Sequence, residues 1–370
     1  MIGCATAYFA ERAGLRTVVV EKRPALATLT TPVATGAFRL QFDNAEEVAL
    51  VRESVAFFDE LQQRVDLGLK HQGYLFVTRT ASGAGAQREL VAAQRQWGLS
   101  DVELLDGVEA RRRFPYLAED VINARFRQGD GWLEPRRLAL ELAGLSGATF
   151  QTGVTVTDVL WNGDRVRGVA TTAGPIEADT VVIAAGPLSG PIAARAHLEL
   201  PLATVRRHKL IIPDVPQVPQ DAPMTIDVET GAHWRPAGGG AHALWTAPAP
   251  AEPPQDEVPA SSSFAFGLLD PRSDHALVRI VPFWKEVWLS PRLQWWLQAG
   301  QYTYTPDRRP LLGPTIIAGL AVNTGYSGHG IMGSIGGSRR AVDAITGALT
   351  PGENPFRPDR PMEHRSFDIL

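Results

Sequence analysis

The segment best suited to hold a ligand is a glycine-rich run near the end of the chain, Gly325 to Ile331 (GYSGHGI). Its three glycines would let backbone N–H groups approach a ligand closely before a helix begins. The N-terminus of such a helix favours negative charge. The simpler alternative is a glycine-rich start of a helix that binds nothing. The segment therefore predicts a site for an anionic group but does not name the group.

Two further segments could lie beside a nucleotide, and the first of them has the spacing of a nucleotide-binding βαβ unit. In such a unit a helix opens at the third glycine of G-x-G-x-x-G, and an acidic residue after the second strand binds the ribose hydroxyls. Gly3 stands at the start of an expected helix, and Glu21 follows an apolar strand 18 residues later. The run Val181 to Gly186 predicts a buried strand ending in small residues, against which a flat ligand could lie. Each pattern also occurs in βα units that bind no nucleotide.

Hydrophobic periodicity and turn signals predict the elements that would position these segments. Helices are expected at 1–14, 45–66, 87–97, 105–114 and 138–145, and from the glycine-rich run to about 346. Strands are expected at 17–20, 73–77, 154–157, 166–171, 180–186, 210–213, 275–281 and 320–323. Residues 214–262 read as a hairpin with long loops or as a linker, and 351–370 as a tail over the surface. The βα signals lie at both ends and the antiparallel signals lie between them, which predicts two interleaved domains.

Composition excludes several classes of protein. The 370 residues are 44% hydrophobic, so a large core is possible and disorder is not expected. No run approaches the roughly 18 apolar residues of a membrane span. A net charge of −4 without a basic tract argues against nucleic-acid binding. A single cysteine, Cys4, rules out an internal disulfide and a cysteine-based zinc cluster, and we predict no metal site. With no secretory signal recognised, the expected location is the cytoplasm.

Taken in order, these segments resemble the FAD-dependent D-amino-acid-oxidase-like family, which includes glycine, sarcosine and D-amino-acid oxidases and dehydrogenases. The resemblance runs from residue 1 to about 347. It is most specific at the helix–strand–Glu21 opening, at the AAG strand, and at the pair TPDRRPLLG (305–313) and TGYSGHG (324–330). It implies an α/β fold with a Rossmann-like FAD-binding domain built from 1–68, 136–205 and 300–370. An α+β substrate domain with an antiparallel sheet would comprise 69–135 and 206–299.

The resemblance also implies a set of site residues. The cofactor would be FAD, held without a covalent bond, because Gly300 stands where some sarcosine-oxidase-like members carry a flavin-linked cysteine. Arg39 aligns with an arginine that grips the substrate carboxylate, and Arg235 is a second candidate. The residues expected to contact the cofactor are Gly3, Glu21, Lys22, Val154, Ala185, Gly186, Gly325, Ser327, Gly328, His329, Gly330 and Ile331.

The implied reaction is oxidation of the C–N bond of a small amine or amino acid, of the glycine, sarcosine or D-amino-acid type, by hydride transfer to flavin N5. Such chemistry needs orientation more than an acid–base residue, so no catalytic side chain is assigned. The electron acceptor is oxygen or another carrier, and the oligomeric state stays open.

Two departures from the family pattern keep alternatives open. The first strand and the leading G-x-G are missing, so a form extended upstream is expected to bind FAD better than this chain. The lysine that sarcosine-oxidase-like members place after the GHG loop is replaced by the run Ile331-Met332-Gly333. A non-catalytic or impaired flavoprotein subunit is therefore the main alternative. An NAD-linked dehydrogenase is a further one, although the C-terminal glycine-rich run argues against it.

Overall fold

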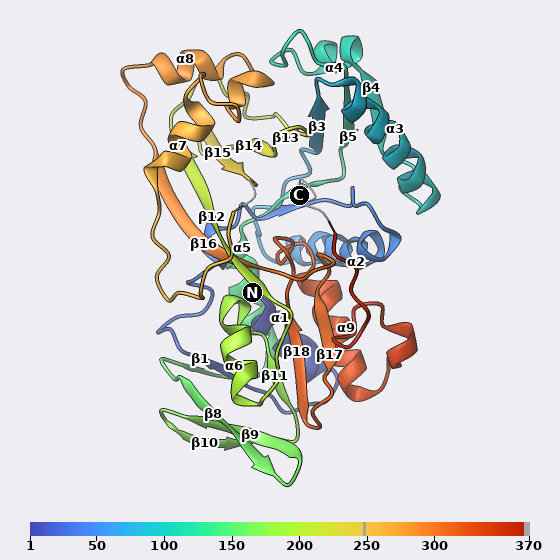
Figure 1. Cartoon of the computed structure of the whole chain (residues 1–370), viewed down its shortest axis with the longest axis vertical. Coiled ribbons are helices and arrows are strands. Elements are labelled where there is room, and N and C mark those ends of the chain that lie inside the picture. Colours follow the sequence, from blue (N-terminus) through green and yellow to red (C-terminus); the bar gives the residue numbers. More distant parts are fainter. Residues whose placement is uncertain (247–248, 366–370) are drawn as a thin grey trace.

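The structure, a computed structural model, describes residues 1–246 and 249–365. One half of the molecule contains a large twisted sheet, and the other half contains several small sheets with α1, α6 and α9 beside them (Figure 1). Segments from the beginning, the middle and the end of the chain meet in the second half (Figure 1). The predicted α/β fold, with elements assembled from separated segments, is confirmed.

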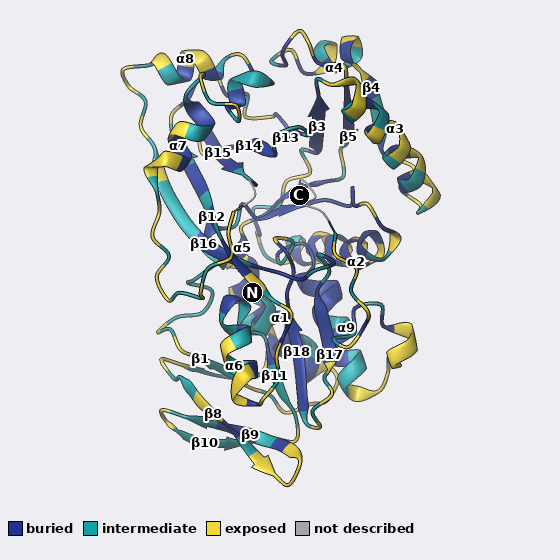
Figure 2. Ribbon diagram, in the orientation of Figure 1, coloured by how far each residue is buried: buried dark blue, intermediate teal, exposed yellow. Residues whose placement is uncertain are grey.

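The large sheet has eight strands, and its central strands are almost entirely buried (Figure 2). Neighbouring strands run antiparallel except β3 and β13, which are parallel, so the sheet is mixed where an antiparallel one was predicted. From edge to edge it contains β16 (Trp296–Tyr304), β12 (Ala203–Ile212), β15 (Gly240–Trp245), β14 (Ala232–Ala237), β13 (Met224–Asp227), β3 (Tyr74–Thr78), β5 (Asn123–Arg127) and β4 (Glu103–Asp106).

The small sheets bring the two ends of the chain together. β1 (Val18–Glu21) pairs in parallel with β7 (Thr149–Thr152). β11 (Val181–Ile183) pairs in parallel with β18 (Leu320–Thr324), which pairs in turn with β17 (Leu311–Pro314). Among the described strands, β1 and β11 each have one ladder partner. The remaining short strands are β2 (Ala37–Phe38) with β6 (Gly131–Trp132), and the antiparallel set β8 (Val156–Asn162), β9 (Arg165–Thr171) and β10 (Gly174–Glu177).

Six of the described α-helices overlap predicted ones, and α6, α7 and α8 were not predicted. The Asn44 side chain accepts a hydrogen bond from the Glu47 N–H at 2.8 Å and so begins α2, whose first-turn carboxylates suit a helix N-terminus. The α-helices are α1 (Ile2–Arg12), α2 (Ala45–Gln62), α3 (Ala81–Gln96), α4 (Gly107–Arg113), α5 (Pro135–Ser146), α6 (Ser189–Arg195), α7 (Ser262–Leu269), α8 (Trp284–Leu289) and α9 (Ser334–Thr346). Short 3₁₀ turns are η1 (Thr31–Val33), η2 (Gly186–Leu188), η3 (Leu277–Arg279) and η4 (Pro351–Glu353).

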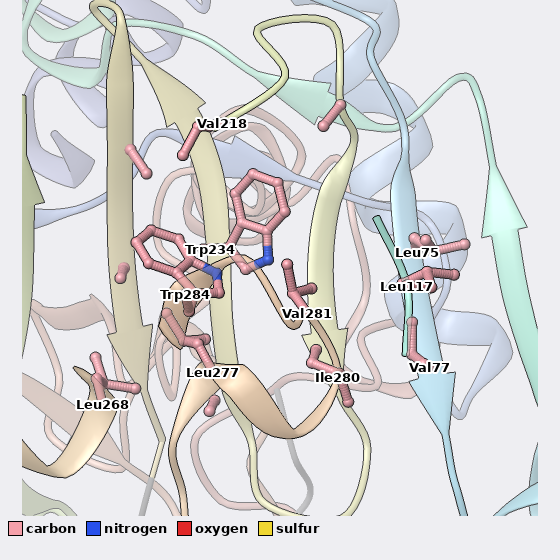
Figure 3. Packing of buried hydrophobic residues seen from close by; sticks show 14 of the residues in the cluster. Leu75, Val77, Leu117, Val218, Trp234, Leu268, Leu277, Ile280, Val281 and Trp284 are labelled. Carbon is pink, nitrogen blue, oxygen red and sulfur yellow. The ribbon is translucent and has the colours of Figure 1, made fainter. Parts of the chain in front are cut away.

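The prediction for residues 275–281, which pack on one face of the large sheet, was wrong. Residues 275–281 were expected to form a strand, but they contain η3 and lead into α8. Leu277, Ile280, Val281 and Trp284 are fully buried, and they pack with Trp234 of β14 (Figure 3). Their spacing of three and four residues puts them on one face of a helical turn, which a strand of period two cannot do.

The segment after α9 also differs from its prediction as a surface tail. Phe356 is fully buried, and its carbonyl oxygen accepts a hydrogen bond from Leu312 N–H of β17 at 2.9 Å. The Asn354 side chain donates to the Leu312 carbonyl oxygen at 2.8 Å. Arg360 forms a buried ion pair with Asp307. This segment therefore covers the edge of β17, and the last five residues of the predicted tail lie outside the described residues.

Two helical glycines provide a matched test of packing. A Cβ at Gly336 of α9 would overlap the Leu50 carbonyl oxygen of α2, whereas a Cβ at Gly144 of α5 would meet open space. We expect Gly336→Ala to lower the free energy of unfolding by about 1–3 kcal/mol through overpacking. Gly144→Ala should raise it by about 0.5–1 kcal/mol, because alanine favours the helix. Urea unfolding of both variants checks this, and a neutral Gly336→Ala would contradict the close packing.

Candidate active site

A cavity of about 510 Å³ lies where the two halves of the molecule meet. Its walls come from residues 34–43, from strands β12, β14, β15 and β16, and from the loop between β18 and α9. Of the residues predicted from the sequence, it brings together Arg39, Ser327, Gly328, His329 and Ile331. The glycine-rich run and the candidate carboxylate-binding arginine, far apart in the sequence, thus face one space.

Arg39 is held as a buried cation at the wall of this cavity. The residue as a whole is only 2% exposed to solvent. The guanidinium carbon lies 4.8 Å from the ring centroid of Phe42 and 5.8 Å from that of Phe76. Rings in these positions stabilise a guanidinium through their negative faces. A planar guanidinium beside a cavity can bind a carboxylate with two parallel hydrogen bonds.

His329 lies close to both Arg39 and a buried carboxylate. Arg39 Nη2 lies 3.4 Å from His329 Nε2, and His329 Nδ1 lies 3.5 Å from Glu47 Oε1. A guanidinium has only donors, so Nε2 is the accepting nitrogen and the proton of a neutral ring sits on Nδ1, facing Glu47. The Phe42 ring packs edge-on against the imidazole with centroids 5.0 Å apart. The histidine therefore orients the arginine.

Arg235 lies behind the cavity wall and is not one of its lining residues. Its Nη2 and Nε donate to the carbonyl oxygen of Thr35 at 2.8 and 3.1 Å. Lys209 of β12 acts similarly, since its Nζ donates to the carbonyl oxygens of Pro32 and Ala34 at 2.8 and 3.4 Å. These two buried cations hold the chain that leads to Arg39. For Arg235 this geometry favours positioning of the wall over the direct substrate contact expected from the sequence.

The buried ammonium of Lys209 makes stability depend on pH. Burial, with the Arg235 charge as a smaller cause, lowers the pKa of Lys209 from 10.5 to about 8. Between these two pH values the unfolded chain binds more protons than the folded chain, so stability from this group rises with pH. Relative to Lys209→Met, the wild type should gain roughly 2 kcal/mol in free energy of unfolding between pH 7 and pH 10. Urea unfolding at several pH values measures the difference, and parallel curves would contradict it.

The other predicted cofactor residues lie around the start of α1 and the ends of β1 and β11. Cβ atoms added at Gly3 and Gly186 would meet open space, so neither glycine is required by packing within the chain. Gly186 has φ of +55°, a conformation suited to glycine. Burial is the main cause that raises the pKa of Cys4; the N-terminal ammonium opposes this increase, and the charge of Glu21 adds to it. Gly3 and Gly186 therefore leave room beside the backbone at these two positions.

The remaining predicted residues have contacts within the protein. Lys22 Nζ forms an ion pair with Asp256 at 2.7 Å on the surface. Val154 lies between β7 and β8, outside the strand predicted for it, and its N–H donates to the Glu21 carbonyl oxygen at 3.1 Å. Gly325 has φ of +75°, and a Cβ there would press on Thr305 at 2.9 Å.

Several cavity residues were missed by the sequence analysis. They come from β12, from β16 and the turn after it, and from the segment after α9: Arg207, Tyr302, Tyr304, Arg308, His364 and Arg365. A usable signal existed at Arg207 and Lys209, two cations at alternate positions just before the apolar run of the predicted strand 210–213. Alternate residues share one face of a strand, so both would point the same way.

The fold and these two regions define a class of protein. A helix–strand–glutamate opening lies beside a strand that ends in Ala185-Gly186, and a separate cavity is walled by a large sheet. This combination is typical of an oxidoreductase with a nucleotide cofactor. The chain belongs to the FAD dependent oxidoreductase family, whose sequence model matches residues 1–344.

Individual relatives are similar over differing shares of their length. The D-amino acid dehydrogenase of Bradyrhizobium diazoefficiens is 28% identical over 226 residues, covering 59% of this chain and 48% of that protein. The mitochondrial sarcosine dehydrogenase of Homo sapiens is 24% identical over 358 residues, covering 90% of this chain and 37% of that protein. The chain thus spans about half or less of these two relatives. The crystal structure of L-proline dehydrogenase from P. horikoshii shows the same fold, with a TM-score of 0.83 at 22% identity, covering 95% of this chain and 92% of that one.

Family membership decides the cofactor. FAD is confirmed, and the NAD-linked alternative is not supported. The open positions at Gly3 and Gly186 fit such a group, because side chains there would fill the space beside the backbone. Membership also does not favour a non-catalytic subunit. Within residues 1–246 and 249–365, no helix combines the length and the apolar character needed to cross a bilayer.

Proposed function

We propose that this protein is a FAD-dependent oxidase or dehydrogenase that oxidises the C–N bond of a small amine or amino acid of the glycine, sarcosine or D-amino-acid type. One observation carries the proposal: the buried guanidinium of Arg39 faces the same cavity as the loop Ser327 to Ile331. A fixed cation at a ligand cavity is suited to a carboxylate, and an amino acid carries one next to its C–N bond. The names of the two similar dehydrogenases agree with this class.

We assign FAD binding and substrate binding to the two domains expected from the sequence. Residues 1–68, 136–205 and 300–370 would hold FAD, and residues 69–135 and 206–299 would supply most of the substrate side. The chemistry that the bound cofactor supplies is hydride acceptance at flavin N5, which leaves an imine for water to hydrolyse. Arg39 would hold the carboxylate, and Glu47 and His329 would keep its guanidinium in place. Orientation of this kind is the main protein contribution to such a reaction.

FAD is proposed to bind without a covalent link. Gly300 lies on β16, and a Cβ there would touch Val33 and the Thr30 backbone, so the position is enclosed by protein. Precipitation of the loaded protein with acid should release all flavin into the supernatant. Flavin that stays with the precipitate would contradict this.

The activity is tested by mixing the FAD-loaded protein anaerobically with glycine, sarcosine, and the enantiomers of alanine and proline. Loss of oxidised-flavin absorbance with at least one of them is the expected result. Alaninamide, which lacks the carboxylate, serves as the matched control and should reduce the flavin far more slowly. Bound flavin that no amine reduces would overturn the proposal and favour the non-catalytic flavoprotein. Repeating the reaction with oxygen and with an artificial dye then identifies the type of acceptor.

A further inference from the structure

The cavity contains a second cationic group on a different wall from Arg39. Arg207 of β12 and Arg308 of the turn after β16 both line it, and both lie against Tyr304. Their guanidinium carbons are 5.3 and 4.6 Å from the Tyr304 ring centroid. Arg207 Nε also donates a hydrogen bond to the Tyr304 hydroxyl at 3.1 Å. We refer to these three residues as the Tyr304 cluster.

Arg308 has an unusual backbone conformation. Its φ is +64°, in the left-handed region that side chains other than glycine rarely adopt. Such conformations persist where the surrounding structure or a function requires them, and they gather at ligand sites. Here the backbone carries a guanidinium into the cavity, over Tyr304. A glycine would adopt the same turn without strain, so the arginine side chain can be removed here without disturbing the turn.

The described cavity walls carry more arginines than carboxylates. Four arginines line it: Arg39, Arg207, Arg308 and Arg365. Two carboxylates also line it, and both have partners away from the Tyr304 cluster. Asp43 accepts hydrogen bonds from Arg365, and Glu47 accepts one from Asn44 at 2.6 Å. Arginines therefore outnumber carboxylates on these walls, and guanidinium groups on two walls suit a ligand with two anionic groups.

We infer that the Tyr304 cluster is a second carboxylate site, and that the preferred substrates are amino acids with two carboxylates. This rests on the proposed function: Arg39 would hold the carboxylate next to the reacting C–N bond, and the Tyr304 cluster would hold the distal one. Guanidinium groups bind carboxylates through charge-assisted hydrogen bonds, and Tyr304 limits the motion of both arginines. The reaction itself is unchanged, since the distal carboxylate forms no bond and transfers no electron.

Isosteric substrate pairs test this inference. Glutamate and glutamine, in both enantiomers, differ in the distal charge with little change of shape. The wild type should show kcat/KM about 10- to 100-fold higher for glutamate, as one charge-assisted contact predicts. In Arg308→Gly, and in Arg207→Gln, this ratio should fall to near one. Arg308→Gly suits the turn, so loss of folding does not obscure the result. Arg272→Gly, a change at an exposed arginine paired with Asp270, should keep the wild-type ratio.

A binding measurement separates this inference from the proposed activity. Glutarate should raise the melting temperature of the wild type more than its monoamide does, and Arg308→Gly should abolish the difference. If no amino acid reduces the flavin, the proposed activity fails, and the glutarate comparison alone decides the second site. The inference is overturned if the wild type does not distinguish the paired ligands, or if the variants keep the wild-type ratio. A third outcome also overturns it: the variants bind less flavin but still distinguish the diacid from its monoamide. The cluster would then serve the cofactor.

Discussion

Replacing Arg39 by alanine should lower kcat/KM for the best amino-acid substrate by about 10²–10³-fold, which corresponds to roughly 3–4 kcal/mol of transition-state stabilisation. The guanidinium is nearly fully buried between Phe42 and Phe76, so solvent cannot replace it as a partner for the carboxylate. Arg39→Lys should recover only part of the loss, because a point charge does not reproduce two parallel hydrogen bonds. Steady-state rates with a dye acceptor measure both variants.

A control for this prediction is available elsewhere in the chain. Arg113 also lies over an aromatic ring, 4.3 Å from the centroid of Phe126, but it is paired with Glu103 away from the cavity. Arg113→Ala should leave kcat/KM within about twofold of the wild type. Flavin content must be measured in every variant. If Arg39→Ala loses flavin and the loaded fraction turns over normally, the arginine serves the cofactor and the proposed carboxylate role is wrong.

The second large effect is expected at Asp130, a carboxylate with 0% exposure. It accepts hydrogen bonds from Leu40 N–H at 2.9 Å, from the Gln41 amide at 2.9 Å, and from Arg127 Nη1 at 2.6 Å. It therefore fixes the two residues that follow Arg39. Asp130→Ala should lower the free energy of unfolding by about 3–5 kcal/mol, because two buried donors lose their acceptor and Arg127, still paired with Asp101, loses its buried partner.

The second ion pair of Arg127 provides a matched control for Asp130→Ala. Arg127 also pairs with Asp101, whose side chain is 54% exposed, at 2.8 Å. Asp101→Ala should cost less than about 1 kcal/mol, as surface ion pairs usually do. Urea unfolding of both variants makes the comparison, and equal effects would show that burial is not the cause. In variants that still fold, a raised KM in Asp130→Ala with unchanged flavin content would connect this carboxylate to the position of Arg39.

Local patterns predicted the longer α-helices, fewer than half of the described strands, and the family. The helix at the start, the Glu21 strand and the strand before Gly186 follow from apolar runs and small residues, which depend on neighbours in the sequence. Arg39 and the glycine-rich run were found as separate segments. Their meeting in one cavity depends on chain contacts nearly 300 residues apart, such as that of Arg39 with His329.

The errors came from tertiary contacts that override local preference. The stretch around Leu277 has strand-forming residues, yet burial against Trp234 favours a helical turn. The segment around Phe356 is rich in proline and charge, and only the open edge of β17 explains its burial. Arg207 was missed because it precedes the predicted strand 210–213, and Tyr304, far away in the sequence, lies beside it only in the folded sheet.

The single parallel pair in the large sheet has a consequence for how the protein is made. β3 pairs with β13, and residues 79–223 separate the two strands. During synthesis, β3, β4 and β5 are made well before β12 to β16, the strands that complete their sheet. Until then β3 presents an unpaired edge with the apolar sequence YLFV, which favours intermolecular pairing. Slow, temperature-sensitive folding and aggregation of chains that stop before residue 224 are the expected kinetic result, since such non-local pairings form late.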